Sequence, residues 1–100
     1  MRVQGTVSGA APTQIDVDTA SKTVVAENYS RYGLVVTNLS TGTMYLGFGT
    51  HSAVVGSGIT ILGNGGNWTM DDYNFTKEAV QAIAHTDNSL MAIQEFEIRS

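Results

Sequence analysis

Residues 90–98 read Leu-Met-Ala-Ile-Gln-Glu-Phe-Glu-Ile, the longest strand-like run in the chain. In an extended strand every second side chain points to the same face, so this run presents two different rows. The rows are Met91, Ile93 and Glu95 on one side and Leu90, Ala92, Gln94 and Phe96 on the other. Such alternation places one row on a core and the other outside it, and it predicts a half-buried strand.

Seven further runs rich in Val, Ile and Thr precede this strand, and Gly and Asn separate them. They span residues 13–18, 22–26, 34–38, 43–48, 59–62, 68–70 and 80–84. Short strands at a spacing of about ten residues are typical of β-sandwiches and barrels. The sequence therefore predicts an all-β fold, a single antiparallel β-sandwich or jelly-roll-like domain of about eight short strands.

The segment 76–85 also permits a helix, because Val80, Ile83 and Ala84 follow one another at helical spacing. Only ten residues lie between the flanking turn signals, and the surrounding sequence is β-rich. We therefore predict a strand here.

Two short polar stretches are predicted to be turns. Leu39-Ser40-Thr41-Gly42 joins two apolar runs and is expected to close a hairpin, with Gly42 at a position that needs a positive φ. Thr86-Asp87-Asn88-Ser89 is expected to join the last two strands in the same way.

Residues 5–11 (GTVSGAA) are mostly small and lead to the only proline, Pro12. We predict an extended N-terminal arm over 1–12, followed by the sandwich domain over 13–100. An arm of this kind can reach a neighbouring molecule, and the residues assigned to that assembly role are Arg2, Val3, Val7 and Pro12.

Composition excludes several classes of function. The chain has 100 residues, of which only 14% are charged, and its formal net charge is −4. Five scattered basic residues leave no electrostatic footprint for nucleic acid or an anionic membrane, so neither partner is expected. No apolar run approaches the roughly 20 residues of a membrane span, and the N-terminus lacks the apolar region of a signal peptide. The absence of cysteine suits folding in a reducing cytosol.

No motif for catalysis is present. His51 and His85 lack any zinc-binding spacing, and no nucleophile elbow or phosphate-binding loop occurs. The loop Asp71-Asp72-x-Asn74 could offer oxygen ligands to Ca²⁺, but solvated edge charges are the preferred interpretation. We expect no enzyme activity, no cofactor and no metal.

Arg31 is the one basic residue set among aromatic residues and strand signals, in Tyr29-Ser30-Arg31-Tyr32. A charge in such a setting is expected to be partly buried and paired. We predict an ion pair with Glu95 of the last strand.

Aromatic and polar residues gather in one region that could bind a sugar. Its members are Trp68, Tyr73, Asn67, Asp71 and Asp72. The preferred interpretation is that Trp68 and Phe75 pack at the end of the sandwich.

The order of several motifs resembles that of small β-sandwich virion proteins of tailed bacteriophages. The shared pattern is an Asn-x-x-Arg turn into an apolar strand ending in Asn, a strand ending in Phe-Gly, a Gly-x-x-Leu turn, an Ala-Ile strand and a closing strand with Glu. In this chain those elements are 23–38 (TVVAENYSRYGLVVTN), 44–49 (MYLGFG), 58–62 (GITIL), 79–84 (AVQAIA) and 92–95 (AIQE). The resemblance covers roughly residues 22–96, and the first 20 residues lie outside it.

The resemblance implies a non-enzymatic structural protein of the virion, assembled in the host cytoplasm. Its expected role is that of a head decoration or cement protein, and its expected partner is the major capsid protein or another virion protein. A homo-oligomer, with a trimer as the first guess, is also expected. The alternatives are a head-fibre, neck or tail component, or a carbohydrate-binding module for attachment to the host surface.

Overall fold

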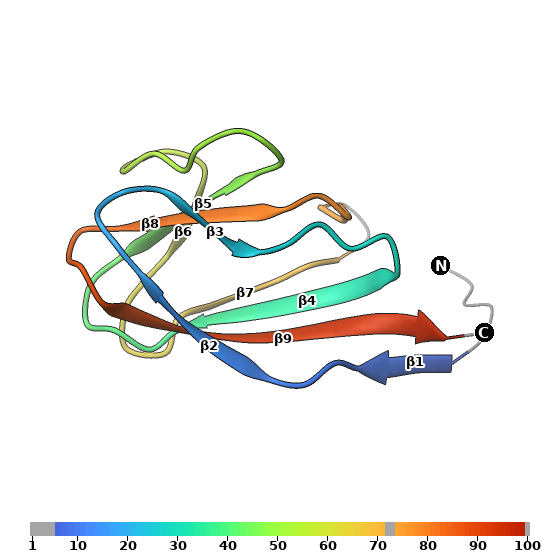
Figure 1. Cartoon of the computed structure of the whole chain (residues 1–100). Coiled ribbons are helices and arrows are strands. Elements are labelled where there is room, and N and C mark those ends of the chain that lie inside the picture. The colour runs from blue at the N-terminus through green and yellow to red at the C-terminus, as the bar shows by residue number, and fades with distance from the viewer. Residues whose placement is uncertain (1–5, 72–73, 100) are drawn as a thin grey trace.

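The computed structural model describes residues 6–71 and 74–99, which form two packed layers of antiparallel strands and no helix (Figure 1). The described part of the chain therefore contains no helix that could cross a membrane. The strands are β1 (Thr6–Gly9), β2 (Thr13–Val17), β3 (Lys22–Val25), β4 (Arg31–Asn38), β5 (Met44–Phe48), β6 (Ile59–Ile61), β7 (Asn67–Thr69), β8 (Val80–Ala84) and β9 (Ser89–Arg99).

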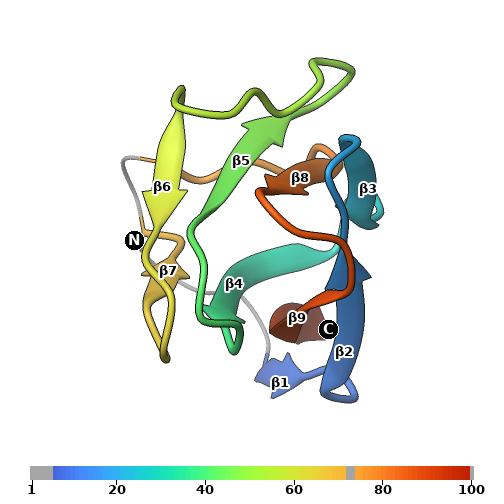
Figure 2. The same ribbon diagram turned by 90° about the vertical axis from the view of Figure 1, so that its left-hand side faces the viewer.

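One layer is a five-stranded sheet in the order β1-β9-β4-β7, in which β2 also pairs with β9. β1 and β2 follow one another along the same edge of β9, because β1 pairs with residues 96–99 and β2 with residues 89–93. The other layer is a four-stranded sheet in the order β3-β8-β5-β6. Figure 2 shows the two layers from one end, with β6 and β7 on one side and β2 and β3 on the other.

These findings confirm the predicted all-β sandwich. All eight predicted runs are strands, including the ambiguous segment 76–85, which contains β8. The strand that the sequence analysis missed is β1, because it expected residues 1–12 to form an arm outside the sandwich. Thr6–Gly9 instead pair with β9 as an edge strand, and residues 1–5 lie outside the described residues.

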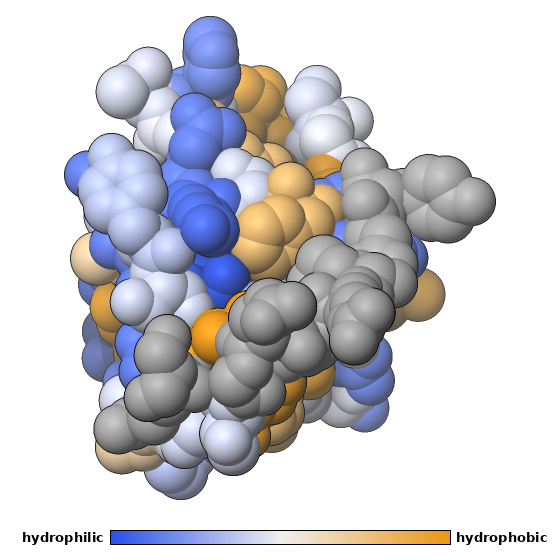
Figure 3. Space-filling view, turned by 90° about the vertical axis from the view of Figure 1, so that its right-hand side faces the viewer, coloured by the Kyte–Doolittle hydropathy of each residue, from blue (hydrophilic) through white to orange (hydrophobic). Residues whose placement is uncertain are grey.

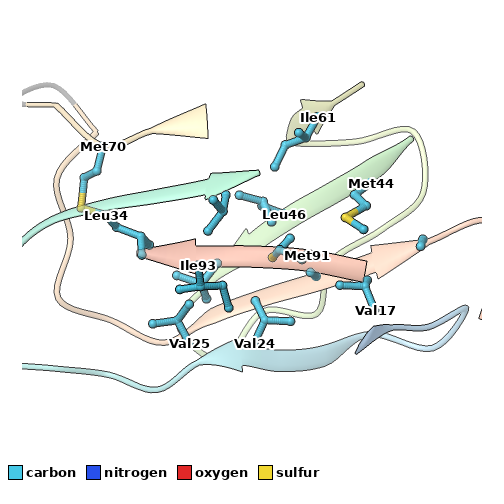
Figure 4. Close-up of a cluster of buried hydrophobic side chains, with 14 residues drawn as sticks. Val17, Val24, Val25, Leu34, Met44, Leu46, Ile61, Met70, Met91 and Ile93 are labelled. Carbon is cyan, nitrogen blue, oxygen red and sulfur yellow. The ribbon is translucent and has the colours of Figure 1, made fainter. Parts of the chain in front are cut away.

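The apolar core lies between the two sheets (Figure 4). Within β9, Met91 and Ile93 are buried in this core, so the row of side chains that begins with Met91 faces inward. The buried hydrophobic residues of the cluster are Val17, Val24, Val25, Leu34, Val36, Met44, Leu46, Ile61, Met70, Val80, Ala82, Ala84, Met91 and Ile93. Ile15, Phe48, Ile59 and Trp68 pack against this cluster.

Both predicted hairpins are wrong, because each connection passes from one sheet to the other. Residues 39–43 lead from β4 to β5, and residues 85–88 lead from β8 to β9. Gly42 does not have a positive φ, whereas Asn64 (φ 60°) and Asn88 (φ 61°) do. Asn tolerates this conformation better than most side chains do, because its amide can bond to nearby backbone.

A buried asparagine fixes the first of these connections. Asn38 is 0% exposed, and its Nδ2 donates to the carbonyl oxygens of Gly42 (2.7 Å) and Ile61 (3.0 Å). Its Oδ1 accepts hydrogen bonds from the backbone N (2.9 Å) and the Oγ (2.6 Å) of Ser40. The amide thus joins the end of β4 to β6 of the opposite sheet through groups that water does not reach.

We predict that Asn38→Ala lowers the free energy of unfolding by about 3 kcal/mol, because buried polar groups would lose their partner. Urea denaturation followed by circular dichroism measures the change. Asn67→Ala is the matched control, since Asn67 is exposed on β7 and its loss should change stability by less than about 0.5 kcal/mol. Equal effects of the two substitutions would contradict this account of Asn38.

Candidate functional site

A β-bulge turns Arg31 toward the interior. Arg31 lies opposite Glu97 and Gly33 opposite Phe96, so β4 advances two residues while β9 advances one. Beyond the bulge the buried residues of β4 are Leu34, Val36 and Asn38, and regular alternation would place Arg31 on the opposite, outer face. The extra residue reverses this alternation and directs the guanidinium between the sheets.

The guanidinium of Arg31 makes hydrogen bonds through all three of its nitrogens, and the side chain is fully buried. Its Nε lies 2.5 Å from Oε2 of Glu95, so the predicted ion pair is present. Its terminal nitrogens donate to three backbone carbonyl oxygens, those of Thr76 (3.0 Å), Glu78 (2.8 Å) and Ala26 (2.9 Å). Beside it, Asn28 Nδ2 donates to Glu97 Oε2 at 2.9 Å.

These contacts give Arg31 a structural role at the end of the sandwich where β4 begins and β9 ends. The outer surface of this end carries both hydrophilic and hydrophobic residues (Figure 3). Each of the three guanidinium nitrogens of Arg31 donates within the protein, and the side chain is fully buried, so this arginine is built into the core and is not presented to a ligand at the surface.

We predict that Arg31→Met lowers the free energy of unfolding by about 3–5 kcal/mol, because it leaves the Glu95 carboxylate without its buried counter-charge. The double variant Arg31→Met with Glu95→Gln should lose less stability than Arg31→Met alone. Chemical denaturation of the three proteins makes the comparison. A double variant less stable than the single one would show that the ion pair is not the cause.

The described residues do not assemble the predicted sugar-binding surface. Trp68 lies opposite Val36 of β4 and packs against Phe48 of the other sheet, with 5.5 Å between ring centroids. Its neighbour Asn67 therefore points to the opposite face. Asp71 and Asn74 exchange hydrogen bonds, Asp71 N to Asn74 Oδ1 (2.6 Å) and Asn74 N to Asp71 Oδ1 (3.1 Å).

The two other members of that predicted surface, Asp72 and Tyr73, lie outside the described residues. The preferred interpretation is confirmed for Trp68, which packs against the core, but not for Phe75, which is exposed. Trp68 and Asn67 are neighbours in sequence that lie on opposite faces of β7.

Neither histidine joins a metal site in the part of the chain that the structure describes. Tyr45 Oη and His85 Nε2 lie 3.3 Å apart on the four-stranded sheet, and their rings meet edge to face. His51 lies in the loop between β5 and β6. Within residues 6–71 and 74–99, no group of three His, Cys, Asp or Glu side chains is placed to hold a metal ion.

The residues of the predicted arm fall in different places. Val7 is exposed on β1, and Pro12 lies in the break between β1 and β2. Arg2 and Val3 lie outside the described residues. In this break, Ala10 N donates to Glu95 O (2.9 Å) and Gln94 Nε2 donates to Ala10 O (2.7 Å), so the segment is fastened to β9.

Two aspartates join the loop after β2 to the loop after β8. Asp87 Oδ1 accepts hydrogen bonds from the backbone N and the Oγ1 of Thr19, both at 2.9 Å. In return, Asp18 Oδ1 accepts one from Asn88 N at 2.9 Å. The bonds from the backbone and hydroxyl of Thr19 hold the pKa of the Asp87 carboxyl below its ordinary value of 3.8.

A lowered pKa in the folded state means that ionised Asp87 stabilises the fold above pH 3.8, its unfolded value. That contribution is lost as the pH falls below 3.8 through the lower folded pKa. We therefore predict that the stability difference between the wild type and Asp87→Asn shrinks as the medium is acidified through this range. Urea midpoints measured at a series of pH values test this. Thr19→Val, which removes one donor, should reduce the effect, and parallel curves for wild type and Asp87→Asn would disprove it.

Charge is distributed unevenly over the sandwich. No Asp, Glu, Lys or Arg occurs in the sequence between Arg31 and Asp71, which includes β5, β6 and β7 entirely. β6 lies at one edge of the four-stranded sheet and β7 at one edge of the five-stranded sheet. The two strands lie on the same side of the molecule (Figure 2). The opposite side, formed by β2 and β3, carries Asp16, Asp18 and Lys22.

We call the side formed by β6, β7 and the loops next to them (residues 39–43 and 62–66) the uncharged side. It exposes two large hydrophobic side chains, those of Leu39 and Leu62. Leu62, directly after β6, is 67% exposed. The sequence analysis noted the low overall charge but missed this surface, and the run without charges is the signal that would have revealed it.

The loop 49–58 is held in place against the four-stranded sheet. Ala53 is buried, its N donates to Ser21 Oγ at 2.8 Å, and it lies so close to Gly47 that a Cβ there would approach the Ala53 backbone to 3.2 Å. Gln81 Nε2 donates to Gly49 O at 3.0 Å. At the tip, Val54 and Val55 are exposed above a turn closed by Ser57 N to Val54 O at 3.1 Å.

Comparison with known proteins gives no match to this chain among protein-family models, curated proteins or solved structures.

Proposed function

We propose that this protein is a non-enzymatic structural subunit of a virion, a head decoration or cement protein that binds the capsid shell through its uncharged side. The observation that carries the proposal is the uncharged run between Arg31 and Asp71, which includes two edge strands on one side of the molecule together with the exposed Leu39 and Leu62. The motif order that resembles phage virion proteins supplies the biological setting.

Open sheet edges are normally guarded, because their free N–H and C=O groups can pair with another chain. Charged side chains are a common guard, and β2 and β3 on the opposite side have them. β6 and β7 have none. An edge without charges is suited to a partner that covers it, since the centres of protein interfaces are depleted in charged residues.

The anchored loop 49–58, which crosses the four-stranded sheet toward Ser21, offers a second uncharged contact surface to the same partner. Binding usually costs free energy when a loop must be ordered. Here Ala53 and Gly49 are already fixed to the sheet, so the exposed Val54 and Val55 are presented in a set position. An apolar contact made by a pre-ordered loop loses less conformational entropy than one made by a mobile segment.

A cement protein needs only a modest interface in each copy, because the symmetry of the shell repeats it many times. The charged side formed by β2 and β3 would then face the solvent. Its charges oppose sheet-to-sheet growth beyond the first layer.

The test is co-sedimentation of the purified protein with undecorated heads assembled from the major capsid protein of the same genome. We expect the wild type to bind and Leu62→Glu to bind at least tenfold more weakly, because the variant places a charge on the uncharged side. Ala20→Glu adds the same charge next to β3 on the opposite side and should bind like the wild type. Failure of the wild type to bind heads, together with binding to a glycan array, would replace this proposal with the carbohydrate-binding alternative.

A further inference from the structure

The turn between β6 and β7 contains a dipeptide that is prone to covalent change. Asn64-Gly65 is the only Asn-Gly sequence in the chain. In such a dipeptide the backbone nitrogen of the glycine can attack the side-chain amide carbon of the asparagine, because glycine has no side chain to hinder the approach. Asn64 and Gly65 are both exposed to solvent. The reactive groups are therefore present at the surface, and the local fold decides whether they react.

The reaction replaces the amide of Asn64 by a carboxylate. The nitrogen of Gly65 gives up its proton and bonds to Cγ of Asn64, while Nδ2 takes up a proton and leaves as ammonia. The product is a cyclic imide that contains the Gly65 nitrogen and both carbonyl carbons of Asn64. Water then opens this ring. Opening at the backbone carbonyl carbon yields isoaspartate, and opening at Cγ yields aspartate.

In the folded protein the attacking nitrogen is held by another group. Gly65 N donates to the backbone carbonyl oxygen of Asn38 at 2.9 Å. The residues on either side are bonded to the same connection, since Asn64 N donates to Ser40 O at 2.7 Å. Gly66 O accepts from Asn38 N, also at 2.7 Å. To close the ring, Gly65 N must leave its acceptor and lose its proton, so these bonds oppose the first step.

The backbone conformation of the turn is fixed as well. Asn64 has a φ of 60° and Gly65 a φ of 95°, so both residues lie in the left-handed region. Asparagine and aspartate enter this region more readily than other residues with a side chain. The shape of the turn thus favours asparagine at position 64, although asparagine before glycine is the reactive combination.

The turn leaves no room for a longer backbone. A Cβ added at Gly63 would lie 2.5 Å from Thr41 O, and one added at Gly66 would collide with Leu62 O. Isoaspartate continues the chain through its side chain, so it adds one methylene to the backbone. A turn that is bonded to residues 38–40 and packed this closely has no space for the extra atom.

We propose that Asn64 is a modification site protected by the fold, and that loss of its amide marks copies of the chain that have unfolded. A folded copy keeps the amide because Gly65 N is bonded to Asn38 O. An unfolded copy is converted mainly to isoaspartate, after which the native turn does not form again. Prolonged unfolding thus becomes irreversible through one defined covalent change.

The modification also alters the uncharged side. Residues 62–66 belong to this surface, and both products carry a carboxylate at position 64. A modified copy would present a negative charge where the proposed shell contact lies, and the centres of interfaces are depleted in charge. This consequence rests on the proposed function, whereas the protection of Asn64 by the turn does not.

Mass spectrometry of protein incubated at one pH and temperature measures the loss of the amide. We expect Asn64 to react at least tenfold more slowly in the native protein than in protein unfolded in guanidinium chloride, because only open molecules react. After dilution, the isoaspartate-containing fraction should fail to regain the native circular dichroism spectrum. Equal rates in the two samples, or a fraction with isoaspartate that refolds like unmodified protein, would overturn the proposal.

Two variants separate protection by this turn from protection by the fold as a whole. Asn38→Ala removes the side-chain bonds that hold residues 40 and 42 beside the turn, whereas Arg31→Met acts at the opposite end of β4. They are compared at guanidinium concentrations that give both the same free energy of unfolding. Asn38→Ala should then lose the Asn64 amide several-fold faster, because it opens the turn locally. Equal rates would show that the turn itself gives no protection.

Asn64→Asp introduces the charge of the modified chain without the added methylene. Aspartate also enters the left-handed region, so this variant should refold and melt near the wild-type temperature. Its failure to refold would show that the charge, not the longer backbone, blocks the turn, which contradicts the proposed effect of isoaspartate. Its binding to heads should be weaker than that of the wild type. Unchanged binding would contradict the proposed function, while the rates measured at Asn64 would still decide the modification.

Discussion

The buried guanidinium of Arg31 is the contact on which the arrangement of the sandwich most depends. It joins β4 to β9 through Glu95. It also binds the backbone carbonyls of Ala26, which directly follows β3, and of Thr76 and Glu78, which precede β8. Both β3 and β8 belong to the other sheet. One side chain thus sets the spacing of the two layers at the end where the apolar core gives way to Glu95 and Glu97. At the other end of β4, the amide of Asn38 makes a similar set of bonds.

The strands could be predicted from the sequence because local alternation and turn residues determine them. The two sheet changes could not, because Leu39–Gly42 and Thr86–Ser89 have the composition of hairpin turns. What decides their path is tertiary: the Asn38 amide holds residues 39–42 against β6, and Asp18 and Asp87 hold the loop after β8 against the loop after β2. β1 was missed for a related reason, since its small residues gain their order from pairing with β9.

The candidate surfaces were harder to predict than the buried pair. Arg31 and Glu95 could be matched because a lone base among strand signals needs an acid, although the bulge that turns Arg31 inward has no clear sequence signature. The polar neighbours of Trp68 permit a surface role as well as packing, and only its pairing with Val36 shows that it is directed inward. Surfaces arise from residues on several strands, so their composition emerges only once the registers are known.

Low charge has different consequences on the uncharged side and on the outer face of the five-stranded sheet. On the uncharged side, the unguarded feature is backbone, because β6 and β7 are short strands at the edges of their sheets, and an edge strand can pair with a strand of another chain. On the outer face of the five-stranded sheet, the backbone is already paired on both sides of β9 and β4, and the unguarded feature is apolar side chains. A covering partner would therefore satisfy hydrogen bonds on the first surface and exclude water from the second. The two surfaces therefore differ in what a covering partner would have to supply, which is hydrogen-bonding backbone in the first case and apolar side chains in the second.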